Sequence, residues 1–516
     1  MAEQQLSRID HYDVKPEAVK LLPLDFCLKK HAVVLRPADK KNDNPALVGM
    51  LHPDSQTLIK EVSDRLNQPV EPVQINAFEF KKALSRGYDV TVFELEELPT
   101  LVLDSECEID FEEPQPPTRI LRGVLAEAIR RRASDIHIEC HESDVELRFR
   151  VDGILHKVPA PFSLENVSRV ISKLKVMSDL DITEHRRAQD GHFSFNYLVG
   201  ETGRQIDVRI NIIPGPYGEE VALRLLDSEQ FILNFENLGF NEKQLKIYQD
   251  LISTPGGMIL VTGPAGSGKT TTLYCSVTAL KSEEKKIITA EDPIEYEFEK
   301  ISQKQITSSM DFSDYTRAFL RQDPDIMLIG EIRDEETADN CIRAANTGHL
   351  VLSTLHTSNS VMAISRLRSL GIHNDYLAEV LNGIIAQRLV RVLCENCKQK
   401  ENPPAELIER FYKEKPEHSF YGPVGCDKCN GIGYKGRTGV FEILIVDREL
   451  KKMIASDTPT ERIHRYVEEN NFDFIYKHAL EKVKAGITSL QEVSRVIMPP
   501  YLFTEKEERE KIKNSS

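Results

Sequence analysis

Apolar and polar residues change their spacing several times along the chain, and each change predicts a different structural unit. Residues 1–92 mix short apolar runs such as HAVVLRP with helix-like patterns such as QTLIKEVSDRL, which predicts a small N-terminal α/β module. Residues 93–117 are acidic and end in prolines, which is typical of a flexible linker. Over residues 118–228 one helix pattern precedes alternating segments such as VELRFRVDG, and this order predicts an α+β domain.

From residue 229 the pattern changes to strand, glycine-rich turn, helix and strand. This order predicts a parallel sheet with crossover helices, so we assign residues 229–385 to an α/β core. Residues 386–437 carry two CxxC pairs, and residues 438–516 have the pattern of a C-terminal helical region with a charged tail. A chain of 516 residues is too long for one hydrophobic core, so the fold class that we expect is multidomain α/β.

Composition narrows the possible functions. The formal charge is -16 and the chain has no tryptophan, so it lacks the basic surface and the stacking aromatic residues that favour nucleic-acid binding. No run approaches the roughly 20 apolar residues that cross a bilayer. The first residues, MAEQQLSRIDHYDVK, lack a basic segment followed by an apolar core. We therefore expect a cytoplasmic protein with no nucleic-acid partner.

The segment GPAGSGKTT has the spacing of a phosphate-binding loop. An apolar run precedes it and a helix pattern follows, which is the context that such a loop requires. Its glycines allow the backbone to turn around phosphate oxygens, Lys269 should reach the β and γ phosphates of ATP, and the Thr270 hydroxyl should bind Mg²⁺. A glycine-rich turn that merely joins a strand to a helix is the alternative. The predicted nucleotide-binding residues are Gly263, Pro264, Ala265, Gly266, Ser267, Gly268, Lys269, Thr270 and Thr271.

Two predicted strands lead onto carboxylates. The apolar run from Ile326 to Ile329 continues into Gly330 and Glu331. A buried carboxylate is costly without a cation, so we predict that Glu331 lies beside Mg²⁺, with a surface ion pair to Arg333 as the alternative. In KIITAEDPIEYEF another strand pattern leads to Glu291, which we predict to activate the attacking water. A solvated acidic turn is the alternative for Glu291.

Basic side chains must offset the charge that develops on a transferred phosphoryl group. Arg317 and Arg321 lie four residues apart in a helix pattern, and His349 and His356 flank a strand pattern in TGHLVLSTLHT. A single arginine is more often a surface ion-pair partner, and a single histidine is more often a core residue. With two arginines from the preceding domain, the candidates are Arg209, Arg224, Arg317, Arg321, His349 and His356.

Four of the nine cysteines form two CxxC pairs. This spacing is typical of a structural zinc site, in which four thiolates leave no open ligand position. An iron–sulfur cluster also takes four cysteines, and free buried thiols are the remaining alternative. The predicted Zn²⁺ ligands are Cys394, Cys397, Cys426 and Cys429.

Taken together, four motifs resemble those of the secretion ATPases, the family that powers type II secretion and type IV pilus assembly. GPAGSGKTT is similar to the Walker A motif of that family, ITAEDPIEY to its Asp box, LRQDPDIMLIGEIRD to its Walker B motif and TGHLVLSTLHT to its His box. Further similar segments, from SDIHIE to GYKGRTGVFEIL, extend the resemblance over roughly residues 118–495.

The resemblance implies a RecA-like P-loop ATPase core, a preceding PAS-like α+β domain and a tetracysteine zinc insert. It implies ATP hydrolysis in which Glu331 is the Walker B glutamate, Glu291 activates water and the four arginines surround the γ-phosphate. It also implies a homo-hexamer that is peripheral to the cytoplasmic face of the inner membrane. The implied partners are the cytoplasmic domain of an inner-membrane secretion protein (GspL-like), which docks on residues 1–92, and a platform protein (GspF-like).

The single short N-terminal module favours a type II secretion ATPase that drives pseudopilus assembly, with a type IV pilus assembly ATPase as the alternative. The tetracysteine element argues against a pilus retraction ATPase. A DNA translocase would need basic, stacking surfaces. A nucleotide-gated scaffold without turnover would not need intact Lys269, Glu291 and Glu331.

Overall fold

The chain divides into two compact units. The computed structural model describes residues 14–23, 26–27, 30–38, 44–50, 53, 56–75, 77–88, 101–104, 116–199, 202–227, 234–414, 416–470 and 472–499. The first unit comprises Met1–Arg130, Asp135–Phe149 and Lys157–Leu226, and the second unit comprises Arg131–Ser134, Arg150–His156 and Asp227–Ser516. Across the described ranges, no helix combines the length and the apolar composition of a membrane span.

The N-terminal part of the first unit is a small α/β module, as the sequence predicts. Its elements are α1 (Pro16–Val19), β1 (Ala32–Arg36), β2 (Ala46–Met50), α3 (Gln56–Leu66), β3 (Val70–Gln74) and α4 (Ala77–Gly87). The sheet has the order β1-β2-β3, in which β2 is antiparallel to β1 and parallel to β3. All of β2 and most of β1 are buried, which explains why these segments are apolar without alternation.

Most of a seven-stranded sheet also lies in the first unit, with the order β4-β8-β9-β10-β5-β6-β7. Its elements are β4 (Leu101–Asp104), α5 (Pro117–Arg130), β5 (Ala133–Cys140), β6 (Val145–Val151), β7 (Ile154–Val158), α6 (Val167–Met177), β8 (Gln189–Val199), β9 (Thr202–Gly215) and β10 (Gly218–Asp227). β6 alternates buried and partly exposed residues, as the sequence pattern predicts for a strand with one covered face.

Strand β4 corrects the expectation that residues 93–117 form a linker without core elements. It pairs in parallel with β8, and Leu103 within it is fully buried. The apolar run LVL is short and acidic residues surround it, so the sequence pattern did not indicate a strand there. Residues 93–100 and 105–115 lie outside the described residues.

The second unit is built on a mixed seven-stranded sheet with the order β13-β12-β14-β15-β11-β16-β19. Its strands are β11 (Gly257–Thr262), β12 (Ile287–Glu291), β13 (Ser302–Gln305), β14 (Ile326–Ile329), β15 (Leu350–Leu355), β16 (Leu381–Leu393) and β19 (Tyr434–Ile445). Neighbouring strands are parallel except β16 and β19, which are antiparallel. β11, β12, β14 and β15 are buried throughout, which accounts for their continuous apolar runs.

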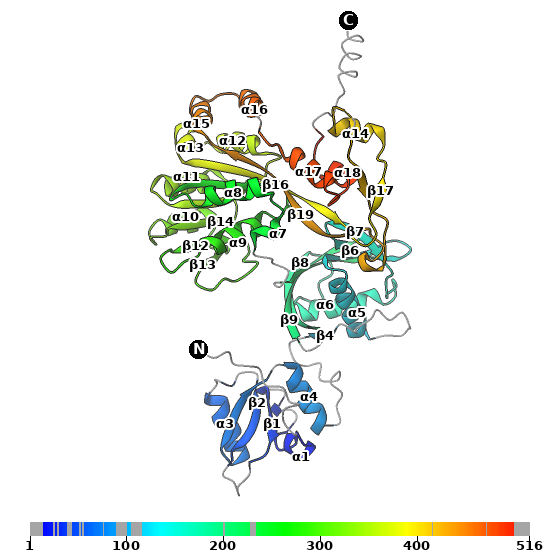
Figure 1. Ribbon diagram of the computed structural model, residues 1–516. Coiled ribbons are helices and arrows are strands. Elements are labelled where there is room, and N and C mark those ends of the chain that lie inside the picture. The colour runs from blue at the N-terminus through cyan, green and yellow to red at the C-terminus, as the bar shows by residue number, and fades with distance from the viewer. Residues whose placement is uncertain are drawn as a thin grey trace. The chain divides into compact units, whose positions relative to one another are not determined.

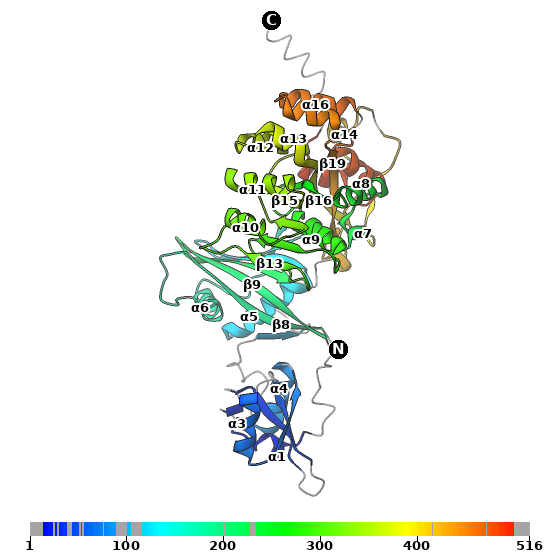
Figure 2. The same ribbon diagram turned by 90° about the vertical axis from the view of Figure 1, so that its left-hand side faces the viewer.

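Helices cover both faces of this sheet. They are α7 (Phe235–Leu238), α8 (Glu242–Ile252), α9 (Lys269–Leu280), α10 (Phe312–Phe319), α11 (Glu335–Asn346), α12 (Ser360–Ser369), α13 (Asn374–Val380), α15 (Arg448–Ala455) and α16 (Thr460–Glu469). Successive residues of β11 serve opposite faces: Leu260 packs in one hydrophobic cluster with α10 to α13, and Val261 packs in another with α8 and α9. Figure 1 and Figure 2 show these helices around the sheet.

The tetracysteine element is inserted between β16 and β19. These strands pair from Gly383 and Ile445 to Leu393 and Tyr434, so the expected boundaries at residues 385 and 438 fall inside them. The core sheet extends further than predicted because each strand runs from the sheet to a cysteine pair. The remaining elements are β17 (Gln399–Glu401), α14 (Ala405–Phe411), β18 (Phe420–Gly422), a 3-10 helix (Asp427–Cys429), α17 (Ile475–Lys484) and α18 (Leu490–Val496).

Candidate active site

The predicted phosphate-binding loop joins the end of β11 to the start of α9. Gly263, Gly266 and Gly268 have φ values of 154°, 72° and 86°, which residues with a side chain rarely adopt. Gly268 supplies no side-chain cap to α9, so the N–H groups of the first turn are directed at a possible ligand. Ser267 Oγ is buried and has no hydrogen-bond partner among the described residues. Both features fit a bound phosphate.

Lys269 is buried at the start of α9 and folds back on the loop. Its Nζ donates to the carbonyl oxygens of Gly263 at 2.9 Å and Pro264 at 3.1 Å. Burial lowers the pKa of Lys269 to about 8, although the nearby Glu331 carboxylate opposes this shift. Thr270, the next residue, is exposed and lines the adjoining pocket. The loop therefore places an ammonium and a hydroxyl side by side, which suits a phosphate with its Mg²⁺.

Glu331 follows β14 and lies at the carboxyl edge of the sheet. Its carboxylate accepts a hydrogen bond from Arg333 Nε, and its Oε2 lies 3.2 Å from His356 Nε2. Burial raises the pKa of Glu331, but the contacts with Arg333 and His356 outweigh it and hold this pKa below its usual value. Glu331 is therefore ionised at neutral pH, as a residue beside Mg²⁺ must be. It also forms the ion pair with Arg333 that the sequence left open as an alternative.

Glu291 ends β12 with only 3% of its surface exposed. The hydroxyls of Tyr274 and Thr289 donate to its carboxylate, and Gln303 Nε2 donates to its Oε1 at 3.0 Å. These donors replace solvent around a buried charge, because an unsatisfied carboxylate there would be destabilising. The burial excludes the solvated acidic turn as a description of Glu291.

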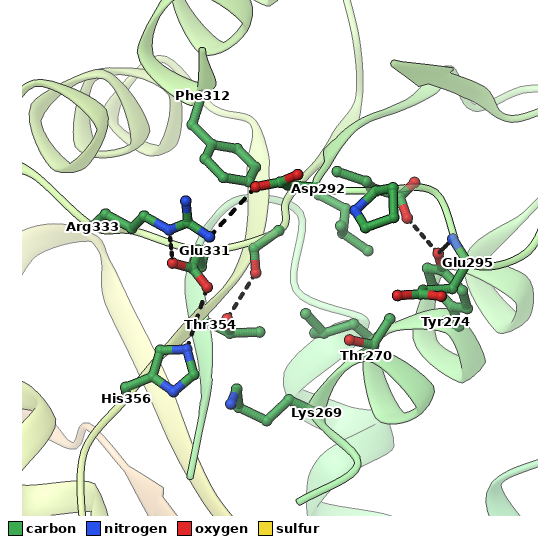
Figure 3. A pocket seen from close by; sticks show the side chains of 15 residues that line it. Lys269, Thr270, Tyr274, Asp292, Glu295, Phe312, Glu331, Arg333, Thr354 and His356 are labelled. Atoms are coloured by element: carbon green, nitrogen blue, oxygen red, sulfur yellow. Dashed lines mark hydrogen bonds and ion pairs between the residues drawn. The ribbon is translucent and has the colours of Figure 1, made fainter. Parts of the chain in front are cut away.

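The start of α9 and the carboxyl ends of β12, β14 and β15 line a pocket of about 180 Å³ (Figure 3). Figure 3 shows Lys269 and Thr270 on one wall, with Glu331, Arg333 and His356 opposite. Parallel strands bring their carboxyl ends to one edge of a sheet, so residues far apart in sequence meet there. The predicted residues that line the pocket are Lys269, Thr270, Glu291, Glu331 and His356.

His349 lies away from this pocket, which corrects the expectation that both histidines face the nucleotide. It precedes β15, whereas His356 follows it, so the strand separates them by about 20 Å. His349 Nδ1 lies 2.8 Å from the carbonyl of Ala344 and 3.0 Å from Thr347 Oγ1, at the end of α11. Its contacts are those of a residue that fixes a helix end.

Of the predicted arginines that lie in the second unit, neither Arg317 nor Arg321 lines the pocket. Arg317 on α10 pairs with Glu336, and Arg321 lies beyond the end of α10 at Phe319, so the two do not share a helix face. Arg209 and Arg224 lie on β9 and β10 of the first unit, where Arg224 Nε donates to Asp135 at 3.0 Å.

Two lining residues were not among the predicted site residues, although the sequence offered Arg333 as an ion-pair partner of Glu331. Arg333 contacts Glu331, lies 3.5 Å from an Asp292 oxygen and stacks over the Phe312 ring at 5.6 Å. Its position two residues after the Walker B glutamate was the available signal. Tyr274 lies four residues after Thr270, on the same face of α9, and this spacing was the signal for it.

The four predicted zinc ligands converge at the ends of β16 and β19. Their sulfur atoms lie within 4.8 Å of one another, and three of the separations are 3.7, 3.8 and 3.9 Å. In a tetrahedron with zinc–sulfur bonds of roughly 2.3 Å, the sulfurs are about 3.8 Å apart. Backbone N–H groups of Gly425 and Gly433 also donate to Cys397 and Cys429 sulfurs, as they do to thiolates. The donor set therefore fits Zn²⁺.

Residues 110–495 match the sequence family described as Type II/IV secretion system protein, and residues 5–92 match the MshEN domain. The chain belongs to the Type II/IV secretion system protein family. This secretion ATPase is 38% identical over 502 residues to the Type II secretion system ATPase E of Vibrio cholerae, covering 93% of this chain and 97% of the relative. The family resemblance stated from the motifs is confirmed, and ATP hydrolysis is its activity.

Other relatives divide between two systems. The secretion ATPase is 40% identical over 501 residues to the Type II secretion system protein E of Dickeya dadantii, covering 93% of this chain and 98% of the relative. It is 38% identical over 447 residues to the Type IV pilus assembly ATPase PilB of Acinetobacter baylyi, covering 83% of this chain and 76% of the relative.

Solved structures share the fold. The ATPase DotB of Legionella pneumophila superposes with a TM-score of 0.56 at 20% identity, covering 77% of this chain and 99% of that one. The pilus retraction motor PilT with bound ADP superposes with a TM-score of 0.50 at 26% identity, covering 74% of this chain and 98% of that one. The multidomain α/β class with a RecA-like core is confirmed.

Proposed function

We propose that this secretion ATPase is the motor of a type II secretion system, in which ATP hydrolysis drives pseudopilus assembly. The observation that carries the proposal is the pocket at the carboxyl edge of the core sheet, which Lys269, Glu291 and Glu331 line together. Relatives that match nearly the whole chain are named as type II secretion ATPases or proteins E, which supports the choice of system.

We assign a role in the reaction to the main residues of this pocket. The backbone N–H groups at the start of α9 and the Lys269 ammonium bind the β and γ phosphates of ATP. Thr270 and the ionised Glu331 would hold Mg²⁺, which when bound would neutralise charge on the phosphate oxygens. Glu291 orients the attacking water and accepts its proton. His356 and Arg333 keep the Glu331 carboxylate in place through their contacts with it.

The arginines and the assembly belong to the proposal as well. We propose a homo-hexamer at the cytoplasmic face of the inner membrane, with Arg209, Arg224, Arg317 and Arg321 acting on the γ-phosphate in the assembled state. Residues 1–92 dock on the cytoplasmic domain of an inner-membrane secretion protein, and a platform protein receives the motion. Zn²⁺ on the four cysteines is structural, because four thiolates leave no open ligand position.

A type IV pilus assembly ATPase is the second candidate, because the PilB relative is also 38% identical over most of this chain. Deletion of the chain in its own organism separates the two. The proposal predicts that secreted enzymes remain inside the cell while surface pili form normally, and that wild-type chain but not the Glu331→Gln variant restores secretion. Loss of pili with normal secretion would establish the second candidate instead.

A further inference from the structure

The hydrogen bonds around Glu291 extend to the loop that follows it. The Tyr274 hydroxyl donates to Glu291 Oε2 and accepts from the backbone N–H of Glu295 at 3.1 Å. Gln303 Nε2 donates to Glu291 Oε1 at 3.0 Å and to the carbonyl of Tyr296 at 2.9 Å, while its Oε1 accepts from Phe298 N at 2.7 Å. Two side chains therefore connect one carboxylate to the backbone of residues 295–298.

Among the described contacts, the three donors leave one acceptor position on the Glu291 carboxylate. A carboxylate offers about four lone-pair sites, two on each oxygen. Thr289 and Gln303 both donate to Oε1, whereas Tyr274 alone among these three donors is directed at Oε2. The remaining site on Oε2 is the position from which Glu291 can accept a proton from water. Tyr274 is therefore the donor that contacts the oxygen to which we assign the reaction with water.

Tyr274 is suited to donate throughout the working pH range. It is 1% exposed, and its ring packs edge-on against Phe298 with centroids 4.9 Å apart. Burial, followed by the adjacent Glu291 charge, raises the pKa of the Tyr274 hydroxyl. The hydroxyl therefore keeps its proton, and the ring that carries it is packed against Phe298.

We propose that Tyr274, assisted by Gln303, is a positioning residue for hydrolysis: it holds Glu291 in the orientation that accepts a proton from water and couples this orientation to the loop after β12. The proposal rests on the proposed role of Glu291. The described hydrogen bonds of the two side chains go to Glu291 and to the backbone of residues 295–298, so we expect their removal to affect turnover more than nucleotide binding.

The test uses the full-length chain and a matched pair of buried tyrosines. Tyr274→Phe removes the bond to Glu291, and Tyr248→Phe removes a comparable buried bond, because Tyr248 Oη lies 2.6 Å from Ser276 Oγ. We expect Tyr274→Phe to lower kcat by roughly tenfold or more, since displaced reacting groups carry such penalties. The KM for ATP should stay within about twofold, and Tyr248→Phe should change kcat by less than about twofold.

A second variant and a double variant complete the test. Gln303→Met keeps the size of the side chain but removes its donor, and should also lower kcat while leaving KM unchanged. In a Glu291→Gln background, Tyr274→Phe should cause no further loss, because a positioning residue acts only through the group that it positions.

Three results would overturn the inference. The first is an equal effect of Tyr274→Phe and Tyr248→Phe on kcat. The second is a full additional loss of kcat when Tyr274→Phe is added to Glu291→Gln. The third is a normal kcat in both Tyr274→Phe and Gln303→Met. Wild-type turnover by Glu291→Gln alone would instead remove the proposed catalytic role of Glu291. The two failures are therefore distinguishable.

Discussion

Alanine substitutions at two glycines of the phosphate-binding loop should destabilise the protein by different amounts. A Cβ atom added at Gly263 would lie 2.5 Å from the Gln387 carbonyl oxygen and 2.6 Å from Ser267 Oγ, whereas one added at Gly266 would meet no atom within 4 Å. Both positions have positive φ, for which a side chain costs about 1–2 kcal/mol. Overpacking adds about 1–3 kcal/mol at Gly263 alone.

Gly263→Ala should therefore destabilise the core sheet by roughly 2–5 kcal/mol and Gly266→Ala by roughly 1–2 kcal/mol. Gly266→Ala should nevertheless weaken ATP binding, because its methyl group occupies the open side of the loop where the backbone must approach phosphate. Gly348→Ala is the matched control: Gly348 also has positive φ and an unobstructed Cβ position, but it lies at the far end of β15.

Hydrogen exchange of the β11 amides measures local stability in each variant, and calorimetry with ATP measures binding. We expect β11 protection to fall most in Gly263→Ala, and ATP affinity to be preserved in Gly348→Ala. Equal protection in Gly263→Ala and Gly266→Ala would refute the steric argument. ATP affinity that is equal in Gly266→Ala and Gly348→Ala would refute the assignment of the loop as the phosphate site.

Three further substitutions test the site and its support. Glu331→Gln should retain ATP binding and lose about a hundredfold or more in single-turnover hydrolysis, and an unchanged rate contradicts its role. Cys426→Ser should lower the zinc content by elemental analysis while Cys275→Ser should not; equal zinc in both is the contrary result. Glu492→Gln should cost about 3–5 kcal/mol, because Glu492 is fully buried and pairs with Arg391 at 2.8 Å. Burial raises the pKa of Glu492, but hydrogen bonds from Arg495 and Arg391 outweigh burial and lower this pKa overall. The stabilisation by Glu492 is therefore present above the pKa of the unfolded state and is lost as pH falls through the pKa of the folded state. Acid denaturation of Glu492→Gln that follows the same pH dependence as wild type would contradict this prediction.

The sequence predicted the parts of the fold whose signal is local. Continuous apolar runs identified β11, β12 and β14 because strands buried on both faces have no polar alternation. β4 was not predicted, because four residues in an acidic segment are too few to give a recognisable strand pattern. The predicted end of the core at residue 385 was too early, because the second half of β16 leads directly to a cysteine pair and was assigned to the tetracysteine element.

In the candidate site too, residues with a local sequence signal were predicted and residues without one were not. Lys269, Glu291 and Glu331 stand next to predicted strands, so topology alone brings them to one edge of the sheet. His349 was misplaced because a motif with histidines at both ends of a strand does not indicate which end faces the ligand. Tyr274 was missed because its spacing from Thr270 indicates only a shared face of α9, whereas its proposed function depends on a contact with Glu291 on strand β12.

The most direct test of the account is the ATPase rate per chain against protein concentration, measured together with molecular mass and with Glu331→Gln as control. We predict an ATPase rate per chain that rises as hexamers form and that is absent in the Glu331→Gln variant. Full turnover by a stable monomer would contradict the proposed assembly, and equal turnover by the variant would contradict the proposed site.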